Sequence, residues 1–357
     1  MKYVAAFLLS CLLLSPLLIF SQEVYQPDKA GKFILKNNLN ICPGTDKEGF
    51  AARLTIVAEW LHRNDSILLH PKGFDANVSL LGNTCNTGEK PGADEYGNTC
   101  LINFSFHHFY LEKGVPTSAT DWSAHDFELS INNPMGRMGV RLGERGFESG
   151  DDPKFGKLLD AANENLEKYF AASPPEKDFA PGVRLYKGNQ LLIFNPDQPD
   201  FWLPVTVKAV MEALLMYYKI RKEVDTARYN KSMAELAQNG IKMPAADPNT
   251  SVYDIMLEEY KRFSPEELKS PAFRSTDDGV SGINAHGKGN QVVKFNPACW
   301  NKNLPKTAVQ FISLEYKTRS SQDLETFYRD NGRLKDYVGL FINALPVERL
   351  GELMLNK

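Results

Sequence analysis

The sequence lacks most of the signatures from which a function is assigned. It has no HExxH zinc motif, no EF-hand loop, no P-loop and no dinucleotide-binding glycine fingerprint. Its 6 His and 5 Cys include no CxxC pair and no Cys/His cluster at zinc-ligand spacing. We therefore predict neither a metal nor a cofactor, and the sequence alone assigns no catalytic residue.

A strong excess of charge of either sign is also missing. The 41 Lys and Arg nearly balance the 44 Asp and Glu, and the two signs are interspersed. A nucleic-acid-binding protein needs a basic patch or stripe, so we expect no nucleic-acid partner. Because 43% of the residues are hydrophobic, as in ordinary globular proteins, we expect a real core.

The only long apolar run lies at the N-terminus. It extends from Tyr3 to Phe20, contains Pro16, and is followed by the small residue Ser21. A positive start, an apolar stretch and a small residue are typical of a cleavable secretory signal, which we predict for residues 1–21. We therefore expect a secreted or periplasmic protein with no transmembrane segment in its mature chain. A membrane anchor is the alternative.

Cysteine usage is consistent with export. Cys11 leaves with the signal, unless it is the lipid-attachment residue of a lipoprotein. An even number then remains, which favours two disulfides in an exported chain; these residues are Cys42, Cys85, Cys100 and Cys299. Cys85 and Cys100 each follow Gly-Asn-Thr and flank a polar loop, so we expect them to pair and to leave Cys42 for Cys299. The alternative is four free buried thiols.

The pattern of apolar residues predicts a mixed α+β fold. A capping box at Thr45 and apolar residues at helical spacing predict a helix from Asp46 to Arg63. Two aromatic-rich or alternating stretches predict strands at 100–111 and 126–131. Helical patterns recur at 155–170, 205–236, 251–263 and from Asp323 onward. A polar, acidic stretch near residue 150 divides an N-terminal α/β region, 22–150, from a C-terminal α+β module, 151–357.

The C-terminal module contains an apparent internal duplication. Residues 187–206 read KGNQLLIFNPDQPDFWLPVT, and residues 288–307 read KGNQVVKFNPACWNKNLPKT, with ten identical positions and no gap. We interpret the pair as a repeated unit made of a tight turn, a buried strand and an Asn-Pro turn that ends the strand. A weaker match, Ser173-Pro-Pro-Glu and Ser264-Pro-Glu-Glu, predicts a helix start in each copy.

Polar and aromatic residues of the repeat are candidate ligand contacts. A cleft between the two copies would present Asn195, Asn296, Trp202 and Trp300. The alternative is that the repeated residues serve turn chemistry and packing. A separate metal-site hypothesis brings together His108 and Glu112 on one strand with His125 and Glu128 on the next element.

Three functions follow as hypotheses. The first is a non-catalytic module that binds a ligand such as a carbohydrate or another envelope component. The second is a hydrolase that acts on an extracytoplasmic polymer through paired carboxylates. The third is a structural or assembly role in the envelope, which requires a large exposed apolar patch.

Overall fold

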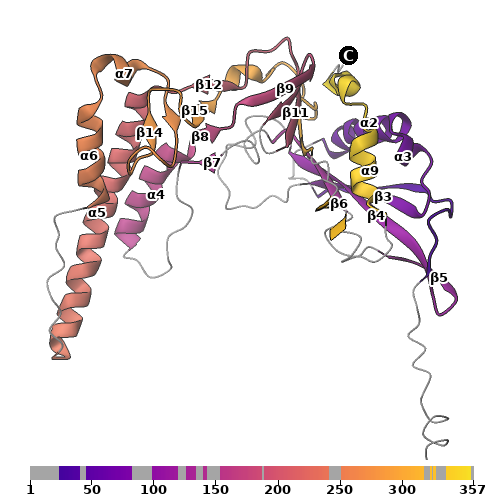
Figure 1. Cartoon of the computed structure of the whole chain (residues 1–357), viewed down its shortest axis with the longest axis horizontal. Coiled ribbons are helices and arrows are strands. Elements are labelled where there is room, and N and C mark those ends of the chain that lie inside the picture. Colours follow the sequence, from indigo (N-terminus) through magenta and orange to yellow (C-terminus); the bar gives the residue numbers. More distant parts are fainter. Residues whose placement is uncertain are drawn as a thin grey trace, which may run out of the picture. The chain divides into compact units, whose positions relative to one another are not determined.

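The computed structural model describes residues 24–40, 46–82, 99–119, 126–133, 140–142, 153–186, 189–240, 251–316, 322–323, 325–326 and 335–354. Several predictions fall outside these residues: the signal peptide at 1–21, Cys42, Cys85, His125, and the domain boundary near residue 150. Within them the chain has helices and mixed sheets, which confirms the α+β class (Figure 1). It divides into two units, residues 1–90, 99–131 and 316–346, and residues 91–98, 132–315 and 347–357.

The first unit is built on the long strand β4. β4 (Cys100–Glu112) pairs antiparallel with β3 (Phe74–Gly82), which in turn pairs in parallel with β2 (Phe33–Asn38). Three further strands pair with β4: β1 (Val24–Tyr25), β5 (Val115–Ala119) and β6 (Asp126–Ile131). Alternate residues of β3 are buried, as a sheet with one covered face requires. The predicted strands at 100–111 and 126–131 are therefore confirmed.

Helices supply the rest of this core. These are α2 (Lys47–Asn64), the short α3 (Ser66–Leu69) and α9 (Tyr337–Ala344). Phe341 of α9 packs on Phe104 and Phe127, with ring centroids 5.7 and 5.0 Å away. Tyr337, at the start of α9, packs on Phe74 of β3 at 4.4 Å. The aromatic residues of β3, β4 and β6 thus form one cluster with a helix that is distant in sequence.

Helix α2 confirms the helix predicted from Asp46 to Arg63. The four apolar residues at helical spacing are all buried: Phe50, Leu54, Val57 and Leu61. Its N-cap is Asp46, whose carboxylate accepts a hydrogen bond from the Gly49 N–H at 2.8 Å. A short side-chain acceptor therefore starts the helix, as predicted, although Asp46 holds the cap position in place of Thr45.

Asp65 joins α2 to α3 from a fully buried position. Its N–H donates to Leu61 at the end of α2, while Oδ1 accepts from the N–H groups of Ile67 and Leu68 at 2.9 and 3.0 Å. Its second carboxylate oxygen is buried and has no hydrogen-bond partner among the described residues. Burial raises the pKa of Asp65 to about 6, although the two backbone hydrogen bonds oppose that shift.

We predict that Asp65 makes the protein less stable as pH rises from 4 to 6. In this window the folded chain keeps a proton that the unfolded chain has released, so the free energy of unfolding falls with pH. The full effect is on the order of 3 kcal/mol. Asp65→Asn keeps the acceptor oxygen and removes the charge. Urea unfolding at pH 4 and pH 7.5 should therefore show the variant to be more stable than the parent only at the higher pH.

Asp46→Asn is the matched control for this measurement. It makes the same change at an N-cap, but Asp46 is exposed to solvent. An unchanged fall in stability between pH 4 and 7.5 in Asp65→Asn would contradict the prediction.

The strands of the second unit form two groups. The first group is hydrogen-bonded in the order β16-β11-β10-β9, and the second is a six-stranded sheet in the order β14-β13-β15-β8-β7, with β12 added to β15. Their bounds are β7 (Val140–Arg141), β8 (Tyr169–Ala172), β9 (Pro175–Ala180), β10 (Val183–Tyr186), β11 (Gln190–Phe194), β12 (Trp202–Pro204), β13 (Phe273–Arg274), β14 (Ile283–Asn284), β15 (Asn290–Phe295) and β16 (Phe311–Glu315). Two 3-10 helices, η2 (Pro297–Cys299) and η3 (Val347–Met354), complete this part.

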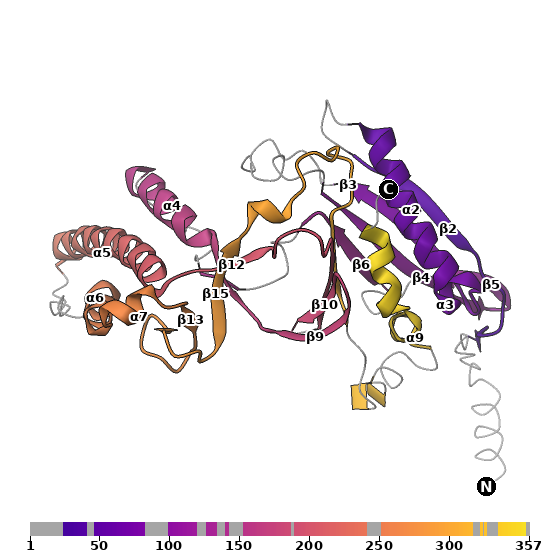
Figure 2. The ribbon, with the colours of Figure 1, turned by 90° about the horizontal axis from the view of Figure 1, so that it is seen from above.

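The helical part of the second unit is centred on α5 (Val207–Gln238). It packs against α4 (Pro153–Glu167) and α6 (Val252–Arg262), and the short α7 (Pro265–Lys269) follows α6. Viewed from above, α4 lies on one side of α5, and α6 and α7 lie on the other (Figure 2). The helices predicted at 155–170, 205–236 and 251–263 are thus confirmed.

The two Ser-Pro sequences adopt different structures. Ser264 caps α7 with a complete capping box, in which the Glu267 carboxylate accepts from the Ser264 N–H at 2.8 Å. The helix predicted after Ser173 is wrong, because residues from Pro175 form the edge strand β9. There Lys177 pairs with Leu185 of β10, so a sheet partner overrides the local capping signal.

Cys100 and Cys299 are free thiols. Their predicted partners, Cys85 and Cys42, lie outside the described residues, so the Cys85–Cys100 and Cys42–Cys299 bridges stay predictions. Cys100 opens β4, opposite Gly82 and Ile131, and its thiol is buried in the core of the first unit. Burial raises the pKa of both thiols, that of Cys299 to about 12. Both thiols are therefore protonated at neutral pH.

Candidate functional site

The two similar segments, 187–206 and 288–307, have the same local hydrogen bonding. The Asn195 side-chain oxygen accepts from the Asp197 N–H at 3.0 Å, and the Asn296 oxygen accepts from the Ala298 N–H at 3.1 Å. The two asparagine carbonyls also accept from the residue three positions on, at 3.2 and 3.1 Å. Each segment therefore ends its strand with the same asparagine turn. An origin by duplication stays a prediction.

The segments are also interlocked by strand pairing. β11 of the first segment pairs with β16, which follows the second segment, so that Phe194 lies opposite Phe311. β15 of the second segment pairs with β12, which lies in the first, so that Phe295 lies opposite Trp202. The strand of the first segment thus pairs with a strand that follows the second segment, and the strand of the second segment pairs with a strand inside the first.

A small cavity lies between the two segments. It is lined by Asn195 and Gln198 from the first turn, by Cys299 and Trp300 from the second, and by Gln310 beside β16. Its volume is about 10 Å³, and a single water molecule needs roughly 10–15 Å³. Two predicted ligand contacts, Asn195 and Trp300, therefore line the same cavity, but the space takes no sugar.

The other two predicted contacts do not line this cavity. Trp202 is only 9% exposed and packs in an aromatic cluster with Phe170 and Phe201. Trp300 belongs to the same cluster. Asn296 is 8% exposed, and its amide donates to the Asp200 carbonyl at 2.6 Å. These contacts favour the packing and turn roles of the repeat, while ligand binding by the four residues stays a prediction.

We predict that Asn296→Ala destabilises the protein more than Asn195→Ala. The first change removes two hydrogen bonds, one to the Asp200 carbonyl and one from the Ala298 N–H, at a cost of roughly 2 kcal/mol. The second removes only the turn bond to Asp197, which is worth about 1 kcal/mol or less. Urea unfolding of both variants checks the difference, provided that the m-values stay equal. Equal losses would show that the Asp200 contact contributes nothing.

The metal-site hypothesis receives no support from the described residues. His108 is buried on β4 beside the rings of Tyr25 and Tyr110. Glu128 lies opposite Asn103, five residues from His108 along the strand, which is a separation of roughly 16 Å. Among the residues that the structure places, no three His, Cys, Asp or Glu side chains gather as metal ligands.

A larger open groove lies between α5 and α6. Six residues of α5 line it, recurring at helical spacing along one face: Lys219, Lys222, Glu223, Thr226, Ala227 and Asn230. Tyr253, in the first turn of α6, lines the other side. The groove has a volume of about 540 Å³, within the range typical of small-molecule sites.

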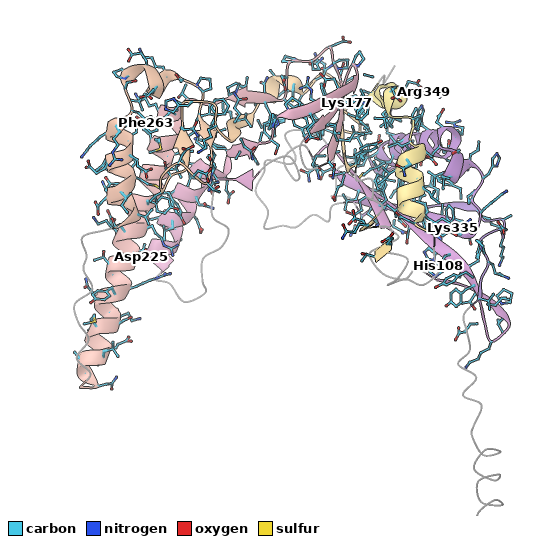
Figure 3. The ribbon with its side chains drawn as sticks, in the orientation of Figure 1. His108, Lys177, Asp225, Phe263, Lys335 and Arg349 are labelled. Atoms are coloured by element: carbon cyan, nitrogen blue, oxygen red, sulfur yellow. The ribbon has the colours of Figure 1, made fainter. Side chains whose placement is uncertain are left out.

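A buried stripe on α5 positions the groove. Met211, Leu214 and Tyr217 are buried in a helical core that also contains Met256 of α6. In the side-chain view, Phe263 marks the end of α6 that leads to α7, and Asp225 lies farther along α5, toward the other end of α6 (Figure 3). The groove therefore lies where the buried stripe of α5 ends and the helix continues.

One ion pair joins the two sides of the groove. The Lys222 ammonium lies 2.6 Å from the Asp254 carboxylate and 5.8 Å from the centroid of the Tyr253 ring. Hydrogen bonds from Lys222 and from the Ser251 hydroxyl lower the pKa of Asp254. Asp254 is therefore ionised at neutral pH, and Lys222 is held by it.

The remaining polar groups of the groove are available to a ligand. Among the described residues, no hydrogen-bond or ion-pair partner is found for the side chains of Lys219, Glu223 and Asn230 or for the Tyr253 hydroxyl. The Thr226 hydroxyl is occupied, because it donates to the Lys222 carbonyl at 2.7 Å. The groove thus offers an ammonium, a carboxylate, an amide and a phenol around one aromatic ring.

No protein-family model, curated protein or solved structure matches the chain. Among the described residues, no helix combines the length and apolar character needed to cross a membrane. The sequence did not reveal the groove. Its lysines, Thr226 and Asn230 look like an ordinary solvated helix face, and Tyr253 comes from another helix. The available signal was their regular spacing on a helix much longer than its neighbours.

Proposed function

We propose that the protein is an exported, non-catalytic ligand-binding protein, and that the groove between α5 and α6 is its binding site. The observation that carries the proposal is the set of polar groups without partners around Tyr253 in a groove of about 540 Å³. Binding sites usually combine an aromatic or apolar surface with a few well-placed polar groups. The hydrolase and envelope-assembly hypotheses stay predictions that no described feature favours.

The local structure of α5 and α6 also fixes the positions of the side chains that line the groove. Lys219 and Lys222 lie within five residues of the buried Tyr217, so the packed part of α5 sets their position. Ser251 caps α6 and hydrogen-bonds Asp254, which fixes the turn that carries Tyr253. Ligand-binding side chains that are carried by helices are more precisely placed than those that are carried by loops.

We predict that Tyr253→Ala weakens ligand binding at least about tenfold, as loss of a central aromatic contact usually does. A thermal-shift screen against cell-wall fragments, sugars and peptides would first identify a ligand, and calorimetric titration would then compare the variants. Tyr229→Ala is the matched control, because Tyr229 is an exposed tyrosine of α5 that does not line the groove. Equal affinity in both variants would place the site elsewhere.

Export is supported by the apolar run from Tyr3 to Phe20 followed by Ser21. We predict that expression of the full chain in a secretion-competent cell yields a product that begins at Gln22. N-terminal sequencing and mass spectrometry of the exported protein would check this. A product that keeps Met1, or one that begins with a lipid-modified Cys11, would contradict it.

A further inference from the structure

We infer that the ligand of the α5–α6 groove is an uncharged carbohydrate chain, an inference that rests on the binding function proposed above. The first argument is the charge of the groove. Lys219 and Lys222 are balanced by the lining residue Glu223 and by Asp254, which pairs with Lys222. An acidic polymer would bring its charges against Glu223, and a basic one would bring them against Lys219.

The second argument concerns the hydrogen-bond donors and acceptors that the side chains of the groove present. Lys219 can only donate, the Glu223 carboxylate can only accept, and the Asn230 amide and the Tyr253 hydroxyl can do both. A sugar hydroxyl both donates and accepts, so neighbouring hydroxyls of one chain can satisfy all four groups. Buried polar groups left without partners weaken binding, so a ligand with hydroxyls on every unit fits this set best.

The third argument concerns shape. Tyr253 presents a partly exposed ring, with the Lys222 ammonium over it at 5.8 Å, in a groove that is also lined by the small side chains of Thr226 and Ala227. The C–H face of a sugar ring packs on such a flat aromatic surface while the hydroxyls at its edge reach polar neighbours. From Lys219 to Asn230 the lining extends over ~16 Å of helix. That length, open to solvent, suits several linked sugar rings better than one.

The test is calorimetric titration of the mature chain with three hexasaccharides of matched length. These are a neutral β-1,4-glucose or N-acetylglucosamine oligomer, an acidic galacturonate oligomer and a basic glucosamine oligomer. We expect the neutral oligomer to bind most tightly, with less than a twofold change in Kd between low and high salt. Exposed charge–charge contacts would be strongly weakened by salt.

Variants identify the contacts. Tyr253→Ala should abolish binding of the neutral oligomer, while Tyr253→Phe, which keeps the ring, should retain most of it. Lys219→Met should weaken binding several-fold and Lys219→Gln less so, since glutamine still donates hydrogen bonds. Circular dichroism and thermal melts of each variant would show that the helices are intact.

The outcomes separate this inference from the proposed function. Preferential, salt-sensitive binding of the acidic oligomer that is lost in Tyr253→Ala would overturn the neutral-sugar inference and keep the groove as the site. If only a peptide bound, and Tyr253→Ala abolished that binding, the neutral-sugar inference would likewise be overturned while the groove would remain the binding site. Tight binding of a neutral oligomer that Tyr253→Ala leaves intact would instead refute the groove as the binding site.

Discussion

Strand β15 is the element on which the second unit depends, because both of its faces are buried. Val292 packs in the helical core with α5, whereas its neighbour Val293 packs in the aromatic cluster with Trp202 and Trp300. The paired strand β8 divides its side chains in the same way, with Ala171 on the helical side and Phe170 on the aromatic side. A strand covered on both faces cannot alternate apolar and polar residues. The apolar run of β8 and the adjacent pair Val292 and Val293 of β15 are therefore a consequence of their place between two cores, and they hold the helical layer to the strands.

That attachment explains why α5 can carry exposed polar groups at defined positions. Up to Tyr217 the helix is fixed by buried contacts, but beyond it Val224 is its only buried residue. The groove spans this transition. Its first residues are positioned by the core, and the Lys222–Asp254 ion pair links the later ones to α6. An exposed ion pair contributes little to stability. Its effect here is to fix the position of Lys222, whereas Lys219 and Glu223 have no such partner among the described residues.

Elements with a strong local pattern could be predicted from the sequence, and those decided by a distant partner could not. Helix α2 and strand β4 follow from the spacing of Phe50, Leu54 and their neighbours and from an aromatic-rich run. Ser173 and Ser264 open nearly the same four residues, yet only the second caps a helix, because β10 offers the first a strand partner. The groove could not be predicted either, because it forms only where α6 packs against α5, and the local sequence does not show how these two helices are aligned. Cysteine spacing carries no information about burial, so it could not predict that Cys100 lies in the core of the first unit.

The contrast between the repeated segments and the groove bears on where function is found in this chain. The residues identical in both segments act in shared local geometry, as the two asparagine turns show. Such identity is what two segments need in order to form the same strand and turn, and this role requires no ligand. The residues that line the groove lie outside both segments, on α5 and α6, and owe their positions to helix packing. Similarity within the chain therefore identifies the framework, whereas the proposed binding surface consists of polar groups that this framework leaves without partners among the described residues.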